Sequence, residues 1–214
     1  MHTGPLVILD PGHGGADPGA RGPNGAVEKE SVLLIARIVR VELERQGYRV
    51  LMTRYDDSNP SYDDRAATAN AHRDAIFISI HVASTGTIGT VHTYYYRFSS
   101  ALPTVTGVAS IPPPAPPGGL GLWEEVQLPY TDASHRFADI LELELAQRLP
   151  GSPATSSAAP VRELRSVALP AVAVEISSVL VSDPNTLLSM GPPLATSIVR
   201  SLQTFRAAGS AGGD

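Results

Sequence analysis

Four side chains in this sequence could together hold a metal ion and move a proton: those of His13, Glu28, His81 and Glu175. Two imidazoles and one carboxylate are a familiar ligand set for zinc, and they leave a fourth position open for water. Zinc lowers the pKa of such a water from about 15.7 towards about 7. Glu175 lies in an apolar run, where it could accept the proton of this water and pass it to a leaving amine. These residue types therefore point to a zinc hydrolase.

Each of these residues also has a plainer interpretation when it is taken alone. His13 follows a glycine turn and could be an ordinary loop residue, and His81 could simply end a strand. Glu28 could stabilise the dipole of a helix from its first turn, a role that Glu30 would fill equally well. Glu175 is harder to dismiss, because an unpaired carboxylate in an apolar setting costs several kcal/mol. It is the joint arrangement of the four residues that favours a metal-binding and catalytic role over these plainer ones.

The predicted elements bring these residues to one rim of a sheet. Apolar runs predict strands over 6–9, 48–53, 75–80, 90–96 and 170–176. Helical spacing predicts one helix from Glu28 to Gly47 and others over 64–72, 134–150, 183–190 and 192–206, with Ser134 as a cap and 151–159 as a link. This order indicates an α/β fold with a mainly parallel sheet and covering helices. His13 and His81 follow strands and Glu28 opens a helix, so all three are expected on the same rim.

Composition narrows the class of protein. At 214 residues, with 43% hydrophobic and 17% charged residues, the chain fits one soluble globular domain. The absence of cysteine excludes disulfides, thiolate zinc sites and cysteine nucleophiles. A net charge of −5 gives no reason to expect a nucleic acid partner, and no apolar run reaches the roughly 18 residues of a membrane span. The N-terminus has no signal-peptide pattern, so we expect either a cytosolic protein or a trimmed domain of a longer one.

Four motifs occur in an order that points to a known family. They are Asp10-Pro11-Gly12-His13-Gly14-Gly15, Glu28-Lys29, Ser79-Ile80-His81 and the run from Pro170 to Ile176. Together they resemble the zinc-dependent N-acetylmuramoyl-L-alanine amidases (amidase type 3). The resemblance implies one zinc ion held by His13, Glu28 and His81, with Glu175 as the catalytic acid and base.

The same resemblance implies a fold, a substrate and a location. We expect a single catalytic domain over 1–208 with a flexible tail over 209–214, built on a twisted sheet of about six strands with helices on both faces. The substrate would be peptidoglycan, cut at the amide between N-acetylmuramic acid and L-alanine. That substrate implies a periplasmic or extracellular enzyme whose export signal has been trimmed. An activator, or a companion cell-wall-binding domain in a longer parent chain, would be its partner.

Residues outside the four motifs are candidates for substrate binding. Ser84 and Ser177 stand where the chain departs from the family pattern, so they could replace lost polar contacts. Arg165 could bind a stem-peptide carboxylate, or it could form a surface ion pair with Glu163. Trp123 could pack on the domain or stack on a sugar.

A proline-rich insertion over 99–131 interrupts the resemblance. One interpretation is an exposed flap, and the other is a plug in which Glu124 or Glu125 occupies the open zinc position. A polyproline segment is stiff and extended, which favours the flap.

Two other function classes fit the same residues. One is a peptidoglycan-binding or regulatory module that has lost catalysis, and the other is a zinc carboxypeptidase that trims stem peptides. Loss of catalysis commonly removes a ligand or the base, so the presence of all four residues favours the amidase.

Overall fold

The structure, a computed structural model, describes residues 4–97 and 126–210, with side chains to residue 208. Its strands are β1 (Leu6–Pro11), β2 (Arg49–Met52), β3 (Ala75–Val82), β4 (Thr90–Tyr96), β5 (Ser157–Ala159) and β6 (Ala171–Ser177). Its helices are α1 (Glu28–Arg45), α2 (Tyr62–Asn70), α3 (Thr131–Arg148), α4 (Arg162–Arg165), α5 (Asn185–Leu188) and α6 (Gly191–Ser210), and a 3-10 turn, η2 (Leu128–Tyr130), precedes α3.

The strands form one six-stranded sheet in the order β2-β1-β3-β6-β4-β5. Neighbouring strands are parallel except β4 and β6, which run antiparallel. The α/β fold with a mainly parallel sheet of about six strands is therefore confirmed. Parallel β1, β3 and β6 end at the same rim, which is where the candidate residues are expected.

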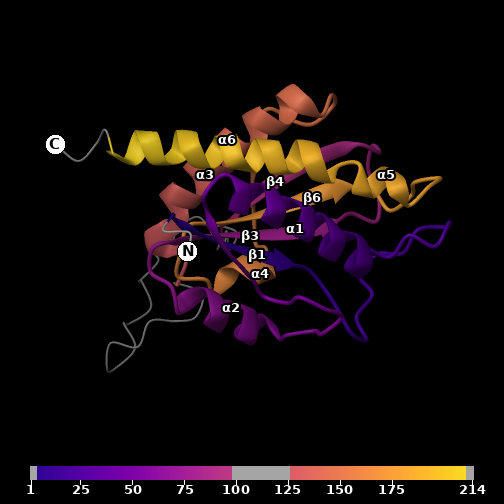
Figure 1. Ribbon diagram of the computed structural model, residues 1–214, viewed down its shortest axis with the longest axis horizontal. Helices are drawn as coiled ribbons and strands as arrows, with labels where there is room; N and C mark the ends of the chain where they lie inside the picture. The colour runs from indigo at the N-terminus through magenta and orange to yellow at the C-terminus, as the bar shows by residue number, and fades with distance from the viewer. Residues whose placement is uncertain (1–3, 98–125, 211–214) are drawn as a thin grey trace, which may run out of the picture.

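Helices cover both faces of the sheet (Figure 1). On one face, α1, α3 and α6 pack against alternate strand residues such as Val7, Leu9 and Val174. On the other face, the shorter α2 and α4 pack against a smaller cluster that includes Ile8 and Phe77. The alternation arises because successive side chains of a strand point to opposite faces. No helix in the described parts of the chain combines the length and apolarity that crossing a bilayer requires.

Two details of the predicted elements are wrong. Ser134 does not cap α3, because the η2 turn leads into the helix at Thr131 and leaves Ser134 buried inside it. There its hydroxyl accepts a hydrogen bond from the backbone N–H of Ala171 at 2.9 Å. The link over 151–159 contains β5, a three-residue edge strand that pairs with β4. β5 is defined by its backbone pairing with β4 and contains no apolar run, so the sequence pattern does not predict it.

Candidate metal centre

The loop after β1 places His13 in an unusual backbone conformation. His13 has φ of 61°, in the left-handed region that residues other than glycine rarely adopt. Gly12 leaves room for the neighbouring imidazole, because a Cβ there would lie 2.3 Å from Cε1 of His81. A Cβ at Gly19 would lie 2.4 Å from Oε2 of Glu28. The glycines therefore let the backbone approach the site more closely than any other residue would permit.

Glu28 joins the two histidines. It is the first residue of α1 and its side chain is buried. Its Oε1 lies 3.2 Å from Nε2 of His13 and 3.0 Å from Nδ1 of His81, and it accepts a hydrogen bond from the Val82 N–H at 2.9 Å. Its Oε2 accepts one from the Ala20 N–H at 2.7 Å. One ligand atom from each of the three predicted residues lies within 4.8 Å of the other two, so the structure brings them together as a group that could hold a metal ion.

The charges in this group stabilise one another. Hydrogen bonding to Glu28 raises the pKa of His13 from 6.5 to about 9, although burial works in the opposite direction. Burial of Glu28 disfavours its charge, but the hydrogen bonds with His13 and His81 outweigh burial and hold the pKa of Glu28 well below its usual range. Burial would lower the pKa of His81, yet its bond to Glu28 raises it overall. The group is therefore an ionised carboxylate between two basic imidazoles.

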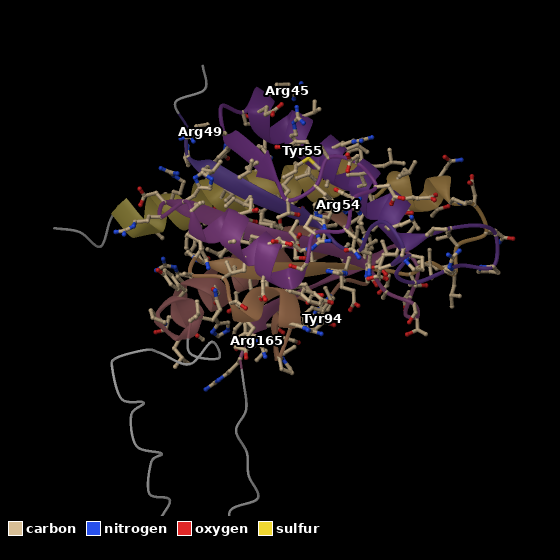
Figure 2. The ribbon with its side chains drawn as sticks, turned by 90° about the horizontal axis from the view of Figure 1, so that it is seen from below. Arg45, Arg49, Arg54, Tyr55, Tyr94 and Arg165 are labelled. Atoms are coloured by element: carbon tan, nitrogen blue, oxygen red, sulfur yellow. The ribbon has the colours of Figure 1, made fainter. Side chains whose placement is uncertain are left out.

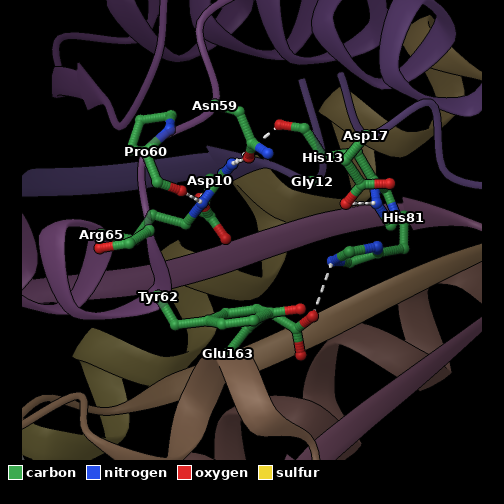
Figure 3. A pocket seen from close by; sticks show the side chains of 11 residues that line it. Asp10, Gly12, His13, Asp17, Asn59, Pro60, Tyr62, Arg65, His81 and Glu163 are labelled. Carbon is green, nitrogen blue, oxygen red and sulfur yellow. Dashed lines mark hydrogen bonds and ion pairs between the residues drawn. The ribbon is translucent and has the colours of Figure 1, made fainter. Parts of the chain in front are cut away.

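The ring nitrogens that face away from Glu28 also meet carboxylates. Nδ1 of His13 lies 2.8 Å from Oδ2 of Asp17, whose Oδ1 accepts a hydrogen bond from the Gly19 N–H at 3.0 Å. Nε2 of His81 lies 3.8 Å from Oε1 of Glu163 on α4 (Figure 3). Each imidazole thus offers its second nitrogen to an acid.

A buried ion pair supports the His13 loop from below. Asp10 ends the apolar part of β1 and is completely buried, and its Oδ1 lies 2.7 Å from Nη1 of Arg65. Arg65 also donates to the backbone carbonyl of His13 at 2.8 Å. Arg54, which lies well inside the molecule in Figure 2, donates to the carbonyl of Gly12 at 2.8 Å. Two arginines therefore fix the backbone that carries His13.

Glu175 lies beside the histidine–glutamate group on the next strand. In the parallel pairing of β3 and β6, Glu175 is the in-register partner of His81. Both line a cavity of about 280 Å³ together with Tyr94 and Val161. Burial, followed by the negative charge of Glu175, raises the pKa of the Tyr94 hydroxyl. A second cavity of about 350 Å³, lined by His13, His81 and residues of the 59–65 segment, adjoins the first (Figure 3).

Comparison with known proteins identifies the family of the chain. A family model described as N-acetylmuramoyl-L-alanine amidase matches residues 7–190. The chain belongs to this amidase family. The amidase AmiC of Neisseria meningitidis serogroup B is 49% identical to it over 77 residues, which are 36% of this chain and 18% of that protein. The sporulation-specific amidase of Bacillus subtilis is 42% identical over 107 residues, 49% of this chain and 41% of that protein. The match therefore spans less than half the length of either curated relative.

Solved amidase structures share the fold. The N-acetylmuramoyl-L-alanine amidase of Clostridium difficile 630 superposes with a TM-score of 0.69 at 22% identity, over 95% of this chain and 97% of that one. The amidase Ami1 of Mycobacterium smegmatis gives a TM-score of 0.67 at 22% identity, over 97% and 99%. At 22% identity this likeness establishes the fold, but not the activity or the roles of single residues.

Those of the remaining candidate residues that the structure describes lie away from the two cavities. Ser84 is exposed in the turn after β3, and Ser177 ends β6, and neither lines the cavities beside His81. Arg165 lies at the border of the molecule in Figure 2 and takes part in none of the ion pairs among the described residues, so the alternative of an ion pair with Glu163 is not observed. Trp123, Glu124 and Glu125 fall outside the described residues, as does most of the insertion over 99–131. Substrate binding by Ser84, Ser177, Arg165 and Trp123 stays a prediction.

Four residues around the site carried no assigned role in the sequence. Asp10 is part of the first family motif, but nothing in the sequence shows that it pairs with Arg65 beneath His13. Asp17 follows the glycine turn as one of several acids, with no signal that it faces an imidazole. The sequence suggests only Arg165 as a partner of Glu163, whereas α4 directs Glu163 towards His81. Spacing within the short segment 162–165 gives no helical face from which this direction could be predicted.

Proposed function

We propose that this chain is a zinc-dependent N-acetylmuramoyl-L-alanine amidase, which hydrolyses the amide between N-acetylmuramic acid and the L-alanine of the stem peptide. Membership of the amidase family supports the reaction. The observation that carries the proposal is the arrangement at the rim of the sheet. There, the ligand atoms of His13, Glu28 and His81 converge, and Glu175 is the next residue across the sheet.

The ligand set fits zinc. In a tetrahedral site with zinc–nitrogen and zinc–oxygen distances of about 2.0–2.1 Å, neighbouring ligand atoms are about 3.3 Å apart. The Glu28 oxygen lies 3.2 Å from the His13 nitrogen and 3.0 Å from the His81 nitrogen, close to this separation. Two imidazoles and one carboxylate are also the donors of many zinc hydrolases, and they leave one position for water. Among the described residues, these three form the group that meets the geometric requirement.

The proposed roles follow from position. His13, Glu28 and His81 would hold the ion, and the backbone N–H groups of Ala20 and Val82 would orient the Glu28 carboxylate through its two oxygens. When bound, zinc would polarise the scissile carbonyl and lower the pKa of the attacking water. Glu175 would accept the proton of that water and deliver it to the departing nitrogen of L-alanine.

The cavity around Glu175 supports this assignment. A general acid and base must reach both the attacking water and the leaving nitrogen, so it must lie in the cleft beside the metal ligands. Glu175 and His81 share one cavity, and the apolar side chains of Val161, Ala173 and Val174 line it as well. A carboxylate in such a cleft is exposed to substrate and shielded from much of the bulk water, which suits proton transfer.

The location and partners belong to the same proposal. Peptidoglycan is outside the cytoplasm, so we propose a periplasmic or extracellular site of action for a catalytic domain over 1–208. As its partner we propose an activator, or a companion cell-wall-binding domain in a longer parent chain.

Metal analysis combined with digestion of purified peptidoglycan tests the function. Protein purified without a chelator should hold one zinc ion per chain and release material from cell walls, and mass spectrometry should find a free lactyl carboxylate on the sugar. Released D-alanine would indicate the carboxypeptidase instead, and zinc binding with no cut product would indicate the binding module. His13→Ala should lose the zinc, because it removes one of three ligands. The matched control His135→Ala changes a histidine on α3 that pairs with Asp139 and should keep it.

A further inference from the structure

One polar atom of the site is left over after the roles above are assigned. Nδ1 of His81 faces Glu28, so Nε2 points to the opposite side of the ring. This Nε2 atom is buried and has no hydrogen-bond partner among the described residues. The charged atom nearest to it in an ion pair is Oε1 of Glu163, at 3.8 Å (Figure 3). Buried polar atoms are nearly always hydrogen-bonded, so an unpaired ring nitrogen that faces a carboxylate indicates a functional role.

The residues on either side of Glu163 pack against the rest of the molecule. Leu164, its neighbour on α4, is completely buried in the core cluster on that face of the sheet. Arg162, on the other side, lies over the ring of Tyr62, with its guanidinium carbon 4.4 Å from the ring centroid. The Glu163 side chain is only 17% exposed and lines both cavities beside His81. It is therefore part of the cleft wall and not a freely moving surface acid.

The chemistry of a metal-binding histidine gives this acid a role. A neutral imidazole that binds a metal through one nitrogen carries its hydrogen on the other, and an acceptor there fixes both the tautomer and the ring orientation. Asp17 lies 2.8 Å from the outer nitrogen of His13. We propose that Glu163 is the corresponding positioning residue for His81: it accepts the Nε2–H of His81 and so keeps Nδ1 available for the metal. This inference rests on the proposed zinc site.

The geometry argues against two other roles for Glu163, a fourth metal ligand and an ion-pair partner of Arg165. Glu163 lies on the side of the imidazole away from Glu28, so it is not placed to be a fourth ligand, and it is absent from the group of converging ligand atoms. It forms no ion pair with Arg165 among the described residues. To reach the 3.2 Å upper limit of an N–H···O hydrogen bond, the carboxylate must approach by about 0.6 Å from its 3.8 Å separation.

Zinc affinity measures the effect without any substrate. We would titrate the intact chain with Zn²⁺ against a coloured chelator for wild type, Glu163→Ala and Glu163→Gln. Loss of an outer acceptor of this kind typically lowers metal affinity 10- to 100-fold. Glu163→Ala should therefore bind zinc at least about 10-fold more weakly than wild type. Glu163→Gln, which keeps a side-chain oxygen that can accept the N–H, should recover most of the loss.

Two further measurements separate positioning from simple attraction between an acid and a cation. Glu30→Gln removes the charge of an exposed acid in the first turn of α1 and serves as the matched control, with an expected change in zinc affinity below about twofold. Nitrogen-15 NMR of the zinc-loaded wild type should show the hydrogen of His81 on Nε2. Thermal unfolding of each variant checks that it is folded.

Several results would overturn the inference. Glu163→Ala with wild-type zinc affinity would do so, and a raised KM in the same variant would place Glu163 against the substrate instead. Equal losses in Glu163→Ala, Glu163→Gln and Glu30→Gln would reduce the effect to charge alone. NMR showing the hydrogen on Nδ1 of zinc-loaded His81 would reverse the assignment of the two nitrogens. Wild-type protein that takes up no zinc would remove the metal site itself, a failure distinct from any difference between variants.

Discussion

Removal of the metal should leave an ion pair whose contribution to stability depends on pH in a defined direction. In the metal-free protein, Glu28 raises the pKa of His13 from 6.5 to about 9. The folded state therefore holds this proton more tightly than the unfolded chain does. The stabilisation is complete below pH 6.5 and is lost as the pH rises through about 9. We therefore expect the metal-free protein to become less stable across this range.

The magnitude follows from the same values. One pKa unit corresponds to about 1.4 kcal/mol, so a rise from 6.5 to about 9 is worth about 3 kcal/mol. The His13 side chain is only 22% exposed, so solvent screening reduces this value modestly. The lowered pKa of Glu28 reports the same interaction from the other partner and must not be added to it. His81, whose pKa is also raised, contributes with the same sign.

Urea unfolding followed by circular dichroism measures this dependence. With a chelator present, the free energy of unfolding should fall by about 3 kcal/mol between pH 6.5 and about 9. His13→Ala should lose most of the fall, and the control His135→Ala should keep it. Zinc-loaded protein should show the opposite trend, because metal binding requires the imidazoles to be deprotonated. A flat or rising profile in metal-free wild type, matching that of His13→Ala, would refute the reasoning.

Three other predictions concern single positions. Glu175→Gln should keep zinc and lose about 100- to 10,000-fold in kcat, since an amide cannot shuttle a proton, and near-normal turnover on peptidoglycan would show that another residue is the base. Gly12→Ala should weaken zinc binding in the chelator titration, because its Cβ would lie 2.3 Å from Cε1 of His81, and unchanged affinity would contradict the clash. Arg65→Ala should lower the free energy of unfolding by about 3–5 kcal/mol, because it leaves the buried Asp10 carboxylate without its ion pair, and a loss below about 1 kcal/mol would contradict this.

The convergence of His13, Glu28 and His81 was predictable because each of them occupies a position that the local sequence pattern reveals. His13 and His81 come at or just beyond the ends of apolar runs, and Glu28 begins a helix of strong periodicity. A parallel sheet brings strand ends and helix starts to one rim, so a correct assignment of elements is enough to place all three together. The place of Glu175 on a strand was predictable for another reason, since the residues around it are apolar.

The supporting contacts were not predictable, because they depend on tertiary packing. The run from 49 to 54 gives no sign that Arg54 is buried, and Arg65 has the sequence context of an exposed helical residue. Their burial is tolerated because backbone carbonyls of the His13 loop accept their hydrogen bonds. Ser134 shows the converse, since a residue type that favours helix caps is used inside the helix to bind the backbone of β6. Helix-capping propensity shows which positions a residue type favours, but tertiary packing decides which position it takes in the fold.

One face of the sheet explains why stability and chemistry coexist in so small a domain. On the face covered by α2 and α4, β1 changes from the buried Ile8 to Asp10, and β3 changes from Phe77 to His81. β6 follows the same course, with alanines before Glu175. On the face covered by α1, α3 and α6, the same strands remain apolar to their ends. Substitutions at the polar ends should therefore alter metal binding and proton transfer while the larger core stays intact. Asp10 is the exception, because it is buried under the site and its ion pair belongs to both the fold and the metal centre.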